Sequence, residues 1–331
     1  MHIAIIGGGF SGLATAWHFL QHAEIKVDIF DPAGIGGGAS SIAAGLLHTF
    51  AGLHAKRNLM ADEGVQAARE LLNHASHMLG TPVYSSSGLL RPAMSEANQR
   101  DYALCAEKYP QDVQWWSTEQ CQKNIVGYPE YPGLYIPLAL TVNSENYLKG
   151  LWLACQAKGA QLRQEEIRAF DCLKNYAAIA ICTGASSLPF FAQKLPITAV
   201  KGQILVLEWP SDCPPLAIPL NSQAYIIMQP DNKTCIVGST YERHFTTVHP
   251  EVDVASREIM PKVAAMYPPL KEAKIVGCRA GVRASTPDHL PLLKQLDPRT
   301  WILSGMGSKG LLYHALYAKK LAKQILVGCL E

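Results

Sequence analysis

Three glycines near the N-terminus constrain the fold of this chain more than any other feature. Gly7, Gly9 and Gly12 have the spacing Gly-x-Gly-x-x-Gly. They directly follow an apolar, strand-like segment at 2–6 and open a segment at 11–22 whose apolar residues recur with helical spacing. The glycine spacing alone is weak evidence. A strand before it and a helix after it are what a dinucleotide-binding unit requires.

An acidic residue completes this pattern. A second strand-like segment at 26–30 is followed by Asp31, nineteen residues after Gly12. In a β-α-β unit of this kind, Gly7 permits the tight turn and Gly9 lets a pyrophosphate approach the helix N-terminus. Gly12 lets helix and strand pack closely, and Asp31 accepts hydrogen bonds from the adenosine ribose. The alternative is a turn that merely requires glycines for its backbone conformation.

Composition excludes several classes of protein. The chain has 331 residues, of which 48% are apolar and 17% charged, so it is not intrinsically disordered and is long enough for two domains or one interleaved unit. Its net charge is only +2, and no three consecutive residues are Lys or Arg, which argues against a dedicated nucleic-acid module.

The nine cysteines predict a reduced, cytoplasmic protein. No two of them have Cys-x-x-Cys spacing, and an odd number fits a disulfide framework poorly. Because a strand is expected from residue 2, we expect no signal peptide. No run of about 18 apolar residues occurs, so we also expect no membrane span. The histidine pairs His18/His22 and His74/His77 have metal-like spacing but no third ligand, and we expect no metal site.

The remaining segments predict an α/β fold, α+β overall, with a Rossmann-like nucleotide-binding domain and an interleaved β-rich domain. The nucleotide-binding domain is expected to comprise 1–80, 140–196 and 276–331, and the β-rich substrate domain 81–139 and 197–275. Helices are expected at 57–79, 96–108, 144–158, 253–266 and 310–327, and further strands at 176–182, 204–207, 225–228, 234–237 and 301–303.

A second glycine turn precedes the last predicted helix. Gly305, Gly307 and Gly310 lie in the sequence Gly-Met-Gly-Ser-Lys-Gly-Leu. A helix N-terminus aimed at an isoalloxazine ring stabilises the negative charge of the reduced flavin, and Lys309 would add a full positive charge. This favours FAD over NAD, which the first fingerprint does not separate. The alternative is a glycine-rich loop before a packing helix.

An arginine near a Thr-Pro-Asp turn is the candidate substrate-binding residue. Arg283 precedes Thr286-Pro287-Asp288, and a guanidinium can bind a substrate carboxylate with two hydrogen bonds. The alternative is a structural arginine paired with Asp288.

Taken together, these motifs resemble the D-amino acid oxidase superfamily, which includes glycine oxidase and sarcosine oxidase. The resemblance covers nearly the whole chain. Within the superfamily the sequence is most similar to the flavin-dependent domain of bifunctional enzymes that modify wobble uridine in tRNA; their methyltransferase half has no counterpart in this sequence. The motifs that carry it are the glycine fingerprint, Gly37-Gly-Ala-Ser40 with Ala43-Ala-Gly45, Lys201-Gly-Gln203, Gly238-Ser-Thr-Tyr-Glu-Arg243, Gly281 to Pro291 and Gly305 to Leu311.

The resemblance implies FAD as the cofactor. Sarcosine oxidase attaches its flavin to a cysteine where this chain has Gly281, and Cys278 lies three residues earlier, so we expect the FAD to be noncovalent. The residues expected to bind it are Gly7, Gly9, Phe10, Ser11, Gly12, Asp31, Ser40, Ala44, Gly45, Thr183, Gly184, Gly307, Ser308, Lys309, Gly310 and Leu311.

For substrate and catalysis the expected residues are Arg283, Lys309, His48 and Tyr241. His48 is placed over the flavin only by the resemblance, and a loop histidine without a catalytic task is its alternative. Tyr241 either faces the substrate or belongs to the core. Lys201 is expected to lie where the chain enters the substrate domain. A purely structural role is its alternative.

The expected function is oxidation of an amine next to a carboxylate. A neutral amine or amino acid would transfer a hydride equivalent to flavin N5, and water would hydrolyse the resulting imine. The electron acceptor, oxygen or another compound, stays open. The alternatives are demodification of carboxymethylaminomethyl-uridine in tRNA, a partner that the charge does not support, and a flavin-binding protein without turnover.

Overall fold

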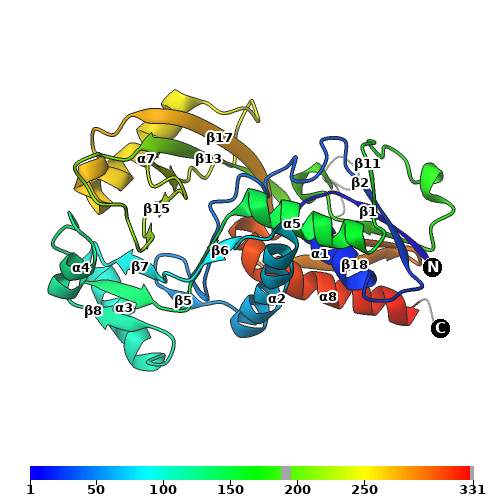
Figure 1. Ribbon diagram of the computed structural model, residues 1–331, viewed down its shortest axis with the longest axis horizontal. Helices are drawn as coiled ribbons and strands as arrows, with labels where there is room; N and C mark the ends of the chain where they lie inside the picture. The colour runs from blue at the N-terminus through cyan, green and yellow to red at the C-terminus, as the bar shows by residue number, and fades with distance from the viewer. Residues whose placement is uncertain (188–194, 329–331) are drawn as a thin grey trace.

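The structure is a computed structural model, and it describes residues 1–187 and 195–328. The molecule is elongated, with two lobes (Figure 1). Both chain ends lie in one lobe, which contains the first two strands and the last helix. The other lobe is built on a large twisted sheet.

The lobe with the chain ends contains a six-stranded sheet with the order β11-β2-β1-β12-β19-β18. The first five strands are parallel, and β18 pairs antiparallel with β19. The bounds are β1 (His2–Ile6), β2 (Lys26–Phe30), β11 (Gln161–Arg163), β12 (Ala178–Ile181), β18 (Leu292–Asp297) and β19 (Thr300–Ser304). The predicted strands at 2–6, 26–30, 176–182 and 301–303 are therefore confirmed.

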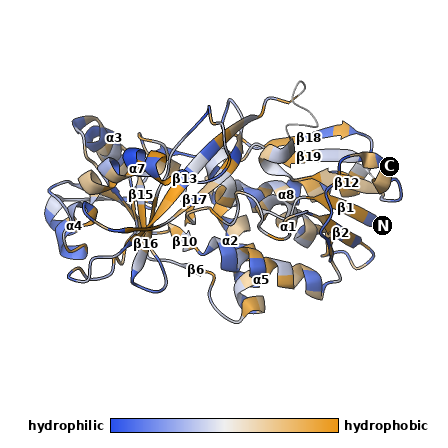
Figure 2. Ribbon diagram, turned by 90° about the horizontal axis from the view of Figure 1, so that it is seen from above, coloured by the Kyte–Doolittle hydropathy of each residue, from blue (hydrophilic) through white to orange (hydrophobic). Residues whose placement is uncertain are grey.

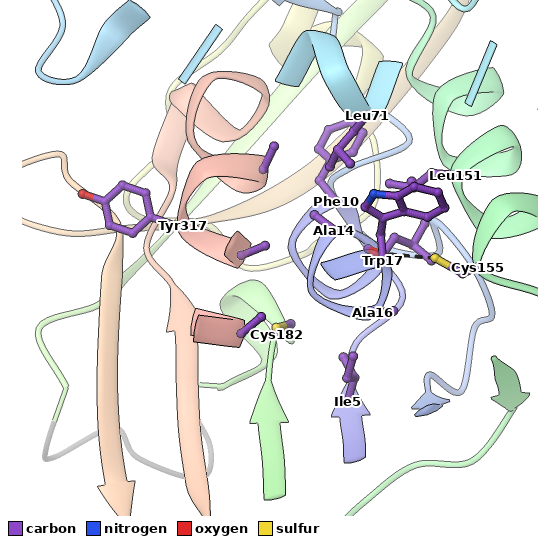
Figure 3. Close-up of a cluster of buried hydrophobic side chains, with 14 of the residues drawn as sticks. Ile5, Phe10, Ala14, Ala16, Trp17, Leu71, Leu151, Cys155, Cys182 and Tyr317 are labelled. Carbon is purple, nitrogen blue, oxygen red and sulfur yellow. Dashed lines mark hydrogen bonds between the residues drawn. The ribbon is translucent and has the colours of Figure 1, made fainter. Parts of the chain in front are cut away.

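One face of this sheet is covered by α1 (Phe10–Phe19) and α8 (Gly310–Gly328), which contact its strands. Helix α5 (Ser144–Ala157) packs on α1, and α2 (Ala61–Leu79) packs on α5 and α8. Strand β1 is buried on both faces, as is typical of parallel sheets. Ile3 and Ile5 pack under the helices, whereas Ala4 and Ile6 belong to a second cluster on the opposite face. Figure 3 shows Ile5 on β1 below α1, which carries Phe10 and Trp17, while Leu71 of α2 and Leu151 of α5 lie at the other end of the same cluster.

The other lobe is built on an eight-stranded sheet with the order β17-β13-β16-β15-β14-β7-β9-β8. Its strands are mostly antiparallel: β7 (Leu89–Pro92), β8 (Gln114–Trp116), β9 (Gly133–Ile136), β13 (Thr198–Glu208), β14 (Leu220–Asn221), β15 (Tyr225–Met228), β16 (Thr234–Gly238) and β17 (Ile275–Ser285). Apolar residues dominate these central strands, whereas α3 (Glu96–Lys108) is largely hydrophilic (Figure 2). Helix α7 (Val252–Met266) is mixed, and its apolar residues Ala255, Ile259, Val263 and Met266 are buried. The expected α/β fold with a second, antiparallel sheet is confirmed.

Smaller elements join the lobes. The strands β3 (Leu46–Leu47), β10 (Leu140–Val142) and β6 (Tyr84–Ser85) form a three-stranded sheet, and β4 (Phe50–Ala51) pairs with β5 (Lys56–Arg57). Short 3-10 turns are η1 (Phe170–Leu173), η2 (Gly184–Ser187), η3 (Pro268–Leu270) and η4 (Gly307–Lys309). The division of the chain into two domains stays a prediction. Strand β17 pairs with β13 along its length and continues past the expected boundary at 276.

Two details differ from the sequence-based expectation. Helix α1 ends at Phe19, before the expected end at 22, because the chain turns at His22 to bring Lys26 beside Met1. Helix α4 (Thr118–Asn124) was not expected. Its N-terminus is a capping box, in which Ser117 and Gln120 bond to each other's backbone N–H, and the Ser-x-x-Gln spacing is its signal in the sequence.

The cysteines of the described residues are all free thiols, and Cys329 lies outside those residues. No group of His, Cys, Asp or Glu in the described ranges is arranged to hold a metal ion. No helix in residues 1–187 or 195–328 is long and apolar enough to cross a membrane.

A buried histidine in α8 makes the stability of this lobe depend on pH. His314 is fully buried, its Nε2 lies 2.6 Å from the Tyr147 hydroxyl, and its Nδ1 lies 3.0 Å from the Gly310 carbonyl oxygen. Burial lowers its pKa from 6.5 to about 4. Between these two values the unfolded chain binds a proton that the folded chain does not, so the folded state loses stability as the pH falls.

We therefore predict that the free energy of unfolding falls between pH 6.5 and pH 4, by roughly 3 kcal/mol for this imidazole. Urea unfolding across this range should show a shallower pH dependence in His314→Gln. A His22→Gln variant, altered on the exposed turn after α1, is the control and should keep the wild-type dependence. Equal pH dependence in His314→Gln and wild type would contradict the account.

Candidate functional site

The glycines of the first fingerprint form a turn that excludes side chains. Gly7 has a φ of +110°, and a Cβ on it would lie 2.5 Å from the Cys182 carbonyl oxygen. A Cβ on Gly12 would lie 1.8 Å from the Gly7 oxygen, and one on Gly9 would lie 2.8 Å from the Ser40 hydroxyl oxygen. The backbone is therefore directly accessible at the start of α1, as a phosphate-binding turn requires.

The N-terminus of α1 is open to an anion. Gly9 is the N-cap, no side chain caps it in the usual way, and the first turn contains no acidic residue. The Phe10 N–H donates to the Ser40 hydroxyl oxygen at 3.1 Å, which fixes the 34–45 loop beside the helix start. Gly45 holds the other end of that loop. It has a φ of +94°, and a Cβ there would lie 2.0 Å from the Val142 carbonyl oxygen.

Asp31 is fixed at the end of β2 next to the fingerprint. Its Oδ2 accepts from the Gly8 N–H at 2.8 Å and its Oδ1 from the Ala33 N–H at 3.0 Å. Each carboxylate oxygen has a second lone pair for a further donor. Thr183 and Gly184 follow β12 on the other side of the fingerprint, and the Ser304 hydroxyl donates to the Gly184 carbonyl oxygen at 3.1 Å.

The C-terminal glycine turn meets the first fingerprint. Gly307 has a φ of +55°, and α8 begins at Gly310. A Cβ on Gly310 would lie 3.9 Å from the Phe10 ring, so the N-termini of α1 and α8 lie close together. Leu311, the next residue of α8, is buried in the core. Two positive helix ends therefore face the same region, which suits an anionic group.

The ammonium of Lys309 is engaged by a neighbouring loop. Its Nζ donates to the His289 carbonyl oxygen at 3.3 Å and lies 5.9 Å from the centre of the Tyr313 ring. Burial lowers the pKa of Lys309, and the charge of Asp288 opposes that shift. The residue thus joins the glycine turn to the loop after β17.

Arg283 extends across the large sheet. The residue is on β17 and pairs with Val200, yet its Nη2 donates to the Ser239 hydroxyl oxygen at 3.1 Å, beyond β13. A Cβ on Gly202 would lie 2.4 Å from Nη2, so the guanidinium lies over this glycine.

The alternative that Arg283 is paired with Asp288 is wrong. In the described part of the chain, no hydrogen bond or ion pair joins Arg283 to Asp288. The exposed carboxylate of Asp288 instead accepts from the Leu290 N–H at 3.0 Å.

A pocket of about 590 Å³ lies between the sheet residues around Arg283 and the C-terminal glycine turn. Its lining residues are Leu53, Val200, Tyr241, Arg243, Arg283, Ser285, His289, Gly307 and Ser308. The backbone of Ser285 bridges to Met306, which closes the pocket between β17 and the C-terminal turn. Arg283, Tyr241, Gly307 and Ser308 were expected in the site, and all four line this pocket.

Sequence analysis missed Tyr225 and Ser239. Tyr225 projects from the same face as Arg283, because both reach that face through the register of β15, β16, β13 and β17. Burial raises the pKa of Tyr225 to about 12, and the Arg283 charge and a hydrogen bond with Ser239 oppose the shift. Ser239 therefore connects the phenol to the guanidinium. Both residues were within segments already noted, but only strand pairing reveals their neighbours.

His48 lies apart from this pocket. Its Nε2 is 3.5 Å from the Asn221 side-chain nitrogen, and its buried Nδ1 has no hydrogen-bond partner in the described residues. Burial and the charge of Arg91 lower its pKa to about 3, so the imidazole is neutral at any pH near neutrality. It is not among the residues that line the pocket.

Lys201 and Cys278 belong to the opposite face of the large sheet. The Lys201 side chain is fully buried, and its Nζ lies 2.5 Å from Glu251 Oε2 and 3.8 Å from Glu242 Oε2. Cys278 is on that face too, with its Sγ 4.0 Å from Gln203 Oε1. The structural alternative for Lys201 fits this placement, and the thiol of Cys278 points away from the face of Arg283.

Known proteins are similar to this chain in sequence and in fold. Residues 2–324 match the family described as DAO, FAD dependent oxidoreductase. The tRNA 5-methylaminomethyl-2-thiouridine biosynthesis bifunctional protein MnmC of Maricaulis maris is 27% identical over 98% of this chain and 52% of its own length. The bifunctional protein ThiO/ThiG of Nostoc is 25% identical over 98% of this chain and 52% of its own length. The chain thus spans about half the length of these relatives.

Among solved structures, glycine oxidase from Geobacillus kaustophilus superimposes with a TM-score of 0.82 at 22% identity, over 97% of this chain and 94% of that one. This likeness confirms the arrangement of a parallel cofactor-binding sheet beside an antiparallel sheet. The family match extends over nearly the whole chain and includes both glycine turns. The chain therefore belongs to the DAO family of FAD-dependent oxidoreductases, and its cofactor is FAD.

Proposed function

We propose that this oxidoreductase oxidises the C–N bond of an amine that carries a carboxylate, such as an amino acid or an N-substituted glycine. The observation that carries the proposal is Arg283, a guanidinium that lines the pocket and has a neutral hydroxyl, Ser239, as its side-chain partner. Among residues 1–187 and 195–328, no acidic side chain lines this pocket, so the charge of Arg283 is left for a ligand. A carboxylate matches the two parallel donors of a guanidinium.

The residues around the glycine turns fit FAD. The accessible backbone from Gly7 to Gly12 would hold the pyrophosphate, and Asp31 the adenosine ribose. The flavin end would lie by Gly307 and Ser308, which line the pocket that contains Arg283. When bound, FAD supplies the two-electron oxidation itself. Lys309 would add positive charge near the flavin end.

The pocket residues orient the substrate and set its protonation state. Arg283 holds the carboxylate, and the shared Ser239 keeps the guanidinium beside Tyr225. In the reaction the substrate loses a hydride from the carbon and a proton from the nitrogen, and water hydrolyses the resulting imine to a carbonyl compound and an amine. Only the neutral amine can do this. A nearby cation lowers the pKa of a bound ammonium, so Arg283 favours the neutral form.

A second candidate substrate is carboxymethylaminomethyl-uridine in tRNA. The similarity to the MnmC relative favours it, and the fragment removed from that nucleoside is also glycine-like. The net charge of +2 argues against tight binding of a long polyanion.

One experiment separates these candidates. The purified holoenzyme is titrated under anaerobic conditions with N-substituted glycines, D-amino acids and tRNA that contains the modified uridine, and the flavin absorbance is followed. Bleaching by small amines at catalytic rates supports the proposal, and bleaching by the tRNA alone contradicts it. A yellow protein that none of them reduces would indicate flavin binding without turnover. Repeating the reaction in air shows whether oxygen is the electron acceptor.

We predict that Arg283→Ala loses about two to three decades of kcat/KM for a carboxylated amine, because loss of one partner of a desolvated charge pair costs about 2–5 kcal/mol. Arg283→Lys should recover part of the loss, since it restores the charge without the bidentate geometry. Steady-state kinetics per bound flavin and melting temperatures are measured on the same samples. A lower melting temperature with unchanged kinetics would show that the arginine is structural.

We also predict that Asp31→Ala weakens FAD binding by roughly tenfold or more, since a ribose acceptor and two backbone contacts at the fingerprint are lost. Flavin absorbance after dialysis measures retention. The matched control is Asp231→Ala. Asp231 accepts from the N–H groups of Lys233 and Thr234 in a turn of the other lobe, and its variant should keep its flavin. Equal retention by both variants would remove Asp31 from the cofactor site.

A further inference from the structure

A second arginine lies at the rim of the proposed substrate pocket. Arg243 lines this pocket together with Arg283, and its side chain is exposed. Its guanidinium lies over the ring of Tyr241, 5.7 Å from the ring centre, and Tyr241 lines the same pocket. A guanidinium stacked on an aromatic face keeps its N–H groups free to bind an anion at the edge.

The positive charge of Arg243 is not neutralised within the described part of the chain. No ion pair or hydrogen bond of its guanidinium is formed in residues 1–187 and 195–328. The adjacent Glu242 is already occupied. Its Oε1 accepts from the Gln203 side chain at 3.0 Å and from the Thr240 hydroxyl, and its Oε2 lies 3.8 Å from the Lys201 ammonium.

A wider cavity of about 870 Å³, which Arg243 also lines, contains the acidic groups. Glu242 and Glu251 line that cavity, and both carboxylates face the buried Lys201 ammonium. The pocket with Arg283 has the opposite character, because its charged lining residues are both arginines and His289 adds a further donor. Acids are thus gathered around Lys201, and the substrate pocket keeps two unpaired cations.

We propose that the substrate carries a second anionic group, a second carboxylate, and that Arg243 binds it at the rim while Arg283 binds the carboxylate beside the reacting amine. This inference rests on the proposed function, since it assumes that Arg283 holds a carboxylate. Arg243 is a specificity-determining residue in this account. It contributes little for an amine with a single carboxylate, because such a substrate leaves the rim empty.

Two pairs of probes test the proposal. The first pair, acetate and succinate, is not oxidised, and its binding to the holoenzyme is measured by calorimetry. Wild type should bind succinate at least tenfold more tightly than acetate, since a charge-assisted contact supplies that much. Arg243→Gln should remove this preference and bind acetate within about twofold of wild type. Arg168→Gln is the control, because Arg168 is exposed and bonded to Glu166 outside the pocket.

The second pair consists of amines, N-methylglycine and N-(carboxymethyl)glycine, followed by anaerobic flavin reduction. Wild type should reduce its flavin more efficiently with the dicarboxylate, and Arg243→Gln should abolish that difference. Equal binding of acetate and succinate by wild type would overturn the second anion site. So would an equal loss of binding for acetate and succinate, or an equal loss of flavin reduction with the two amines, in Arg243→Gln.

These outcomes distinguish the two proposals. If neither amine reduces the flavin but the succinate preference still depends on Arg243, amine oxidation is wrong and the second anion site stands. If both amines react and Arg243→Gln changes neither, the second site is wrong and the proposed oxidation stands.

Discussion

The long antiparallel pair of β13 and β17 positions everything else in the site. Its register runs from Thr198 opposite Ser285 to Leu207 opposite Ile275. One end of β17 reaches the C-terminal glycine turn through the bridge between Ser285 and Met306. The same pairing places Arg283 two residues from that bridge and directs its side chain over Gly202. Without this ladder the guanidinium and the cofactor turn would have no fixed distance between them.

Strand alternation also separates the charges of the molecule. Val200 and Lys201 are neighbours in β13, so their side chains lie on opposite faces of the sheet. The face of Lys201 contains Glu242 and Glu251, which compensate a fully buried ammonium. The face of Val200 contains Arg283, whose side-chain partner is a hydroxyl. Arg283 is partly buried, and a cation in that setting without an acidic partner is available to pair with a substrate carboxylate.

Local spacing made much of the cofactor domain predictable. The first β-α-β unit, Asp31 and the last helix depend on contacts between residues close in sequence, and all were found where the pattern placed them. The surroundings of Arg283 were not predictable in this way. Its neighbours Ser239, Tyr225 and Gly202 are 44, 58 and 81 residues away in the sequence. Local periodicity does not give the register of the strands that bring them to Arg283. The alternative that paired Arg283 with Asp288 rested on their closeness in the sequence, which does not determine whether two side chains meet in space.

The central claim is that Arg283 reaches the pocket by crossing Gly202, and Gly202→Ala tests it most directly. A Cβ there would lie 2.4 Å from the end of a long, flexible side chain, so it should displace the guanidinium rather than the backbone. Acetate binding to the holoenzyme is the measurement. We predict that it weakens by about tenfold or more while the melting temperature and bound flavin stay at wild-type values. Unchanged acetate binding in a folded, yellow Gly202→Ala protein would contradict the account.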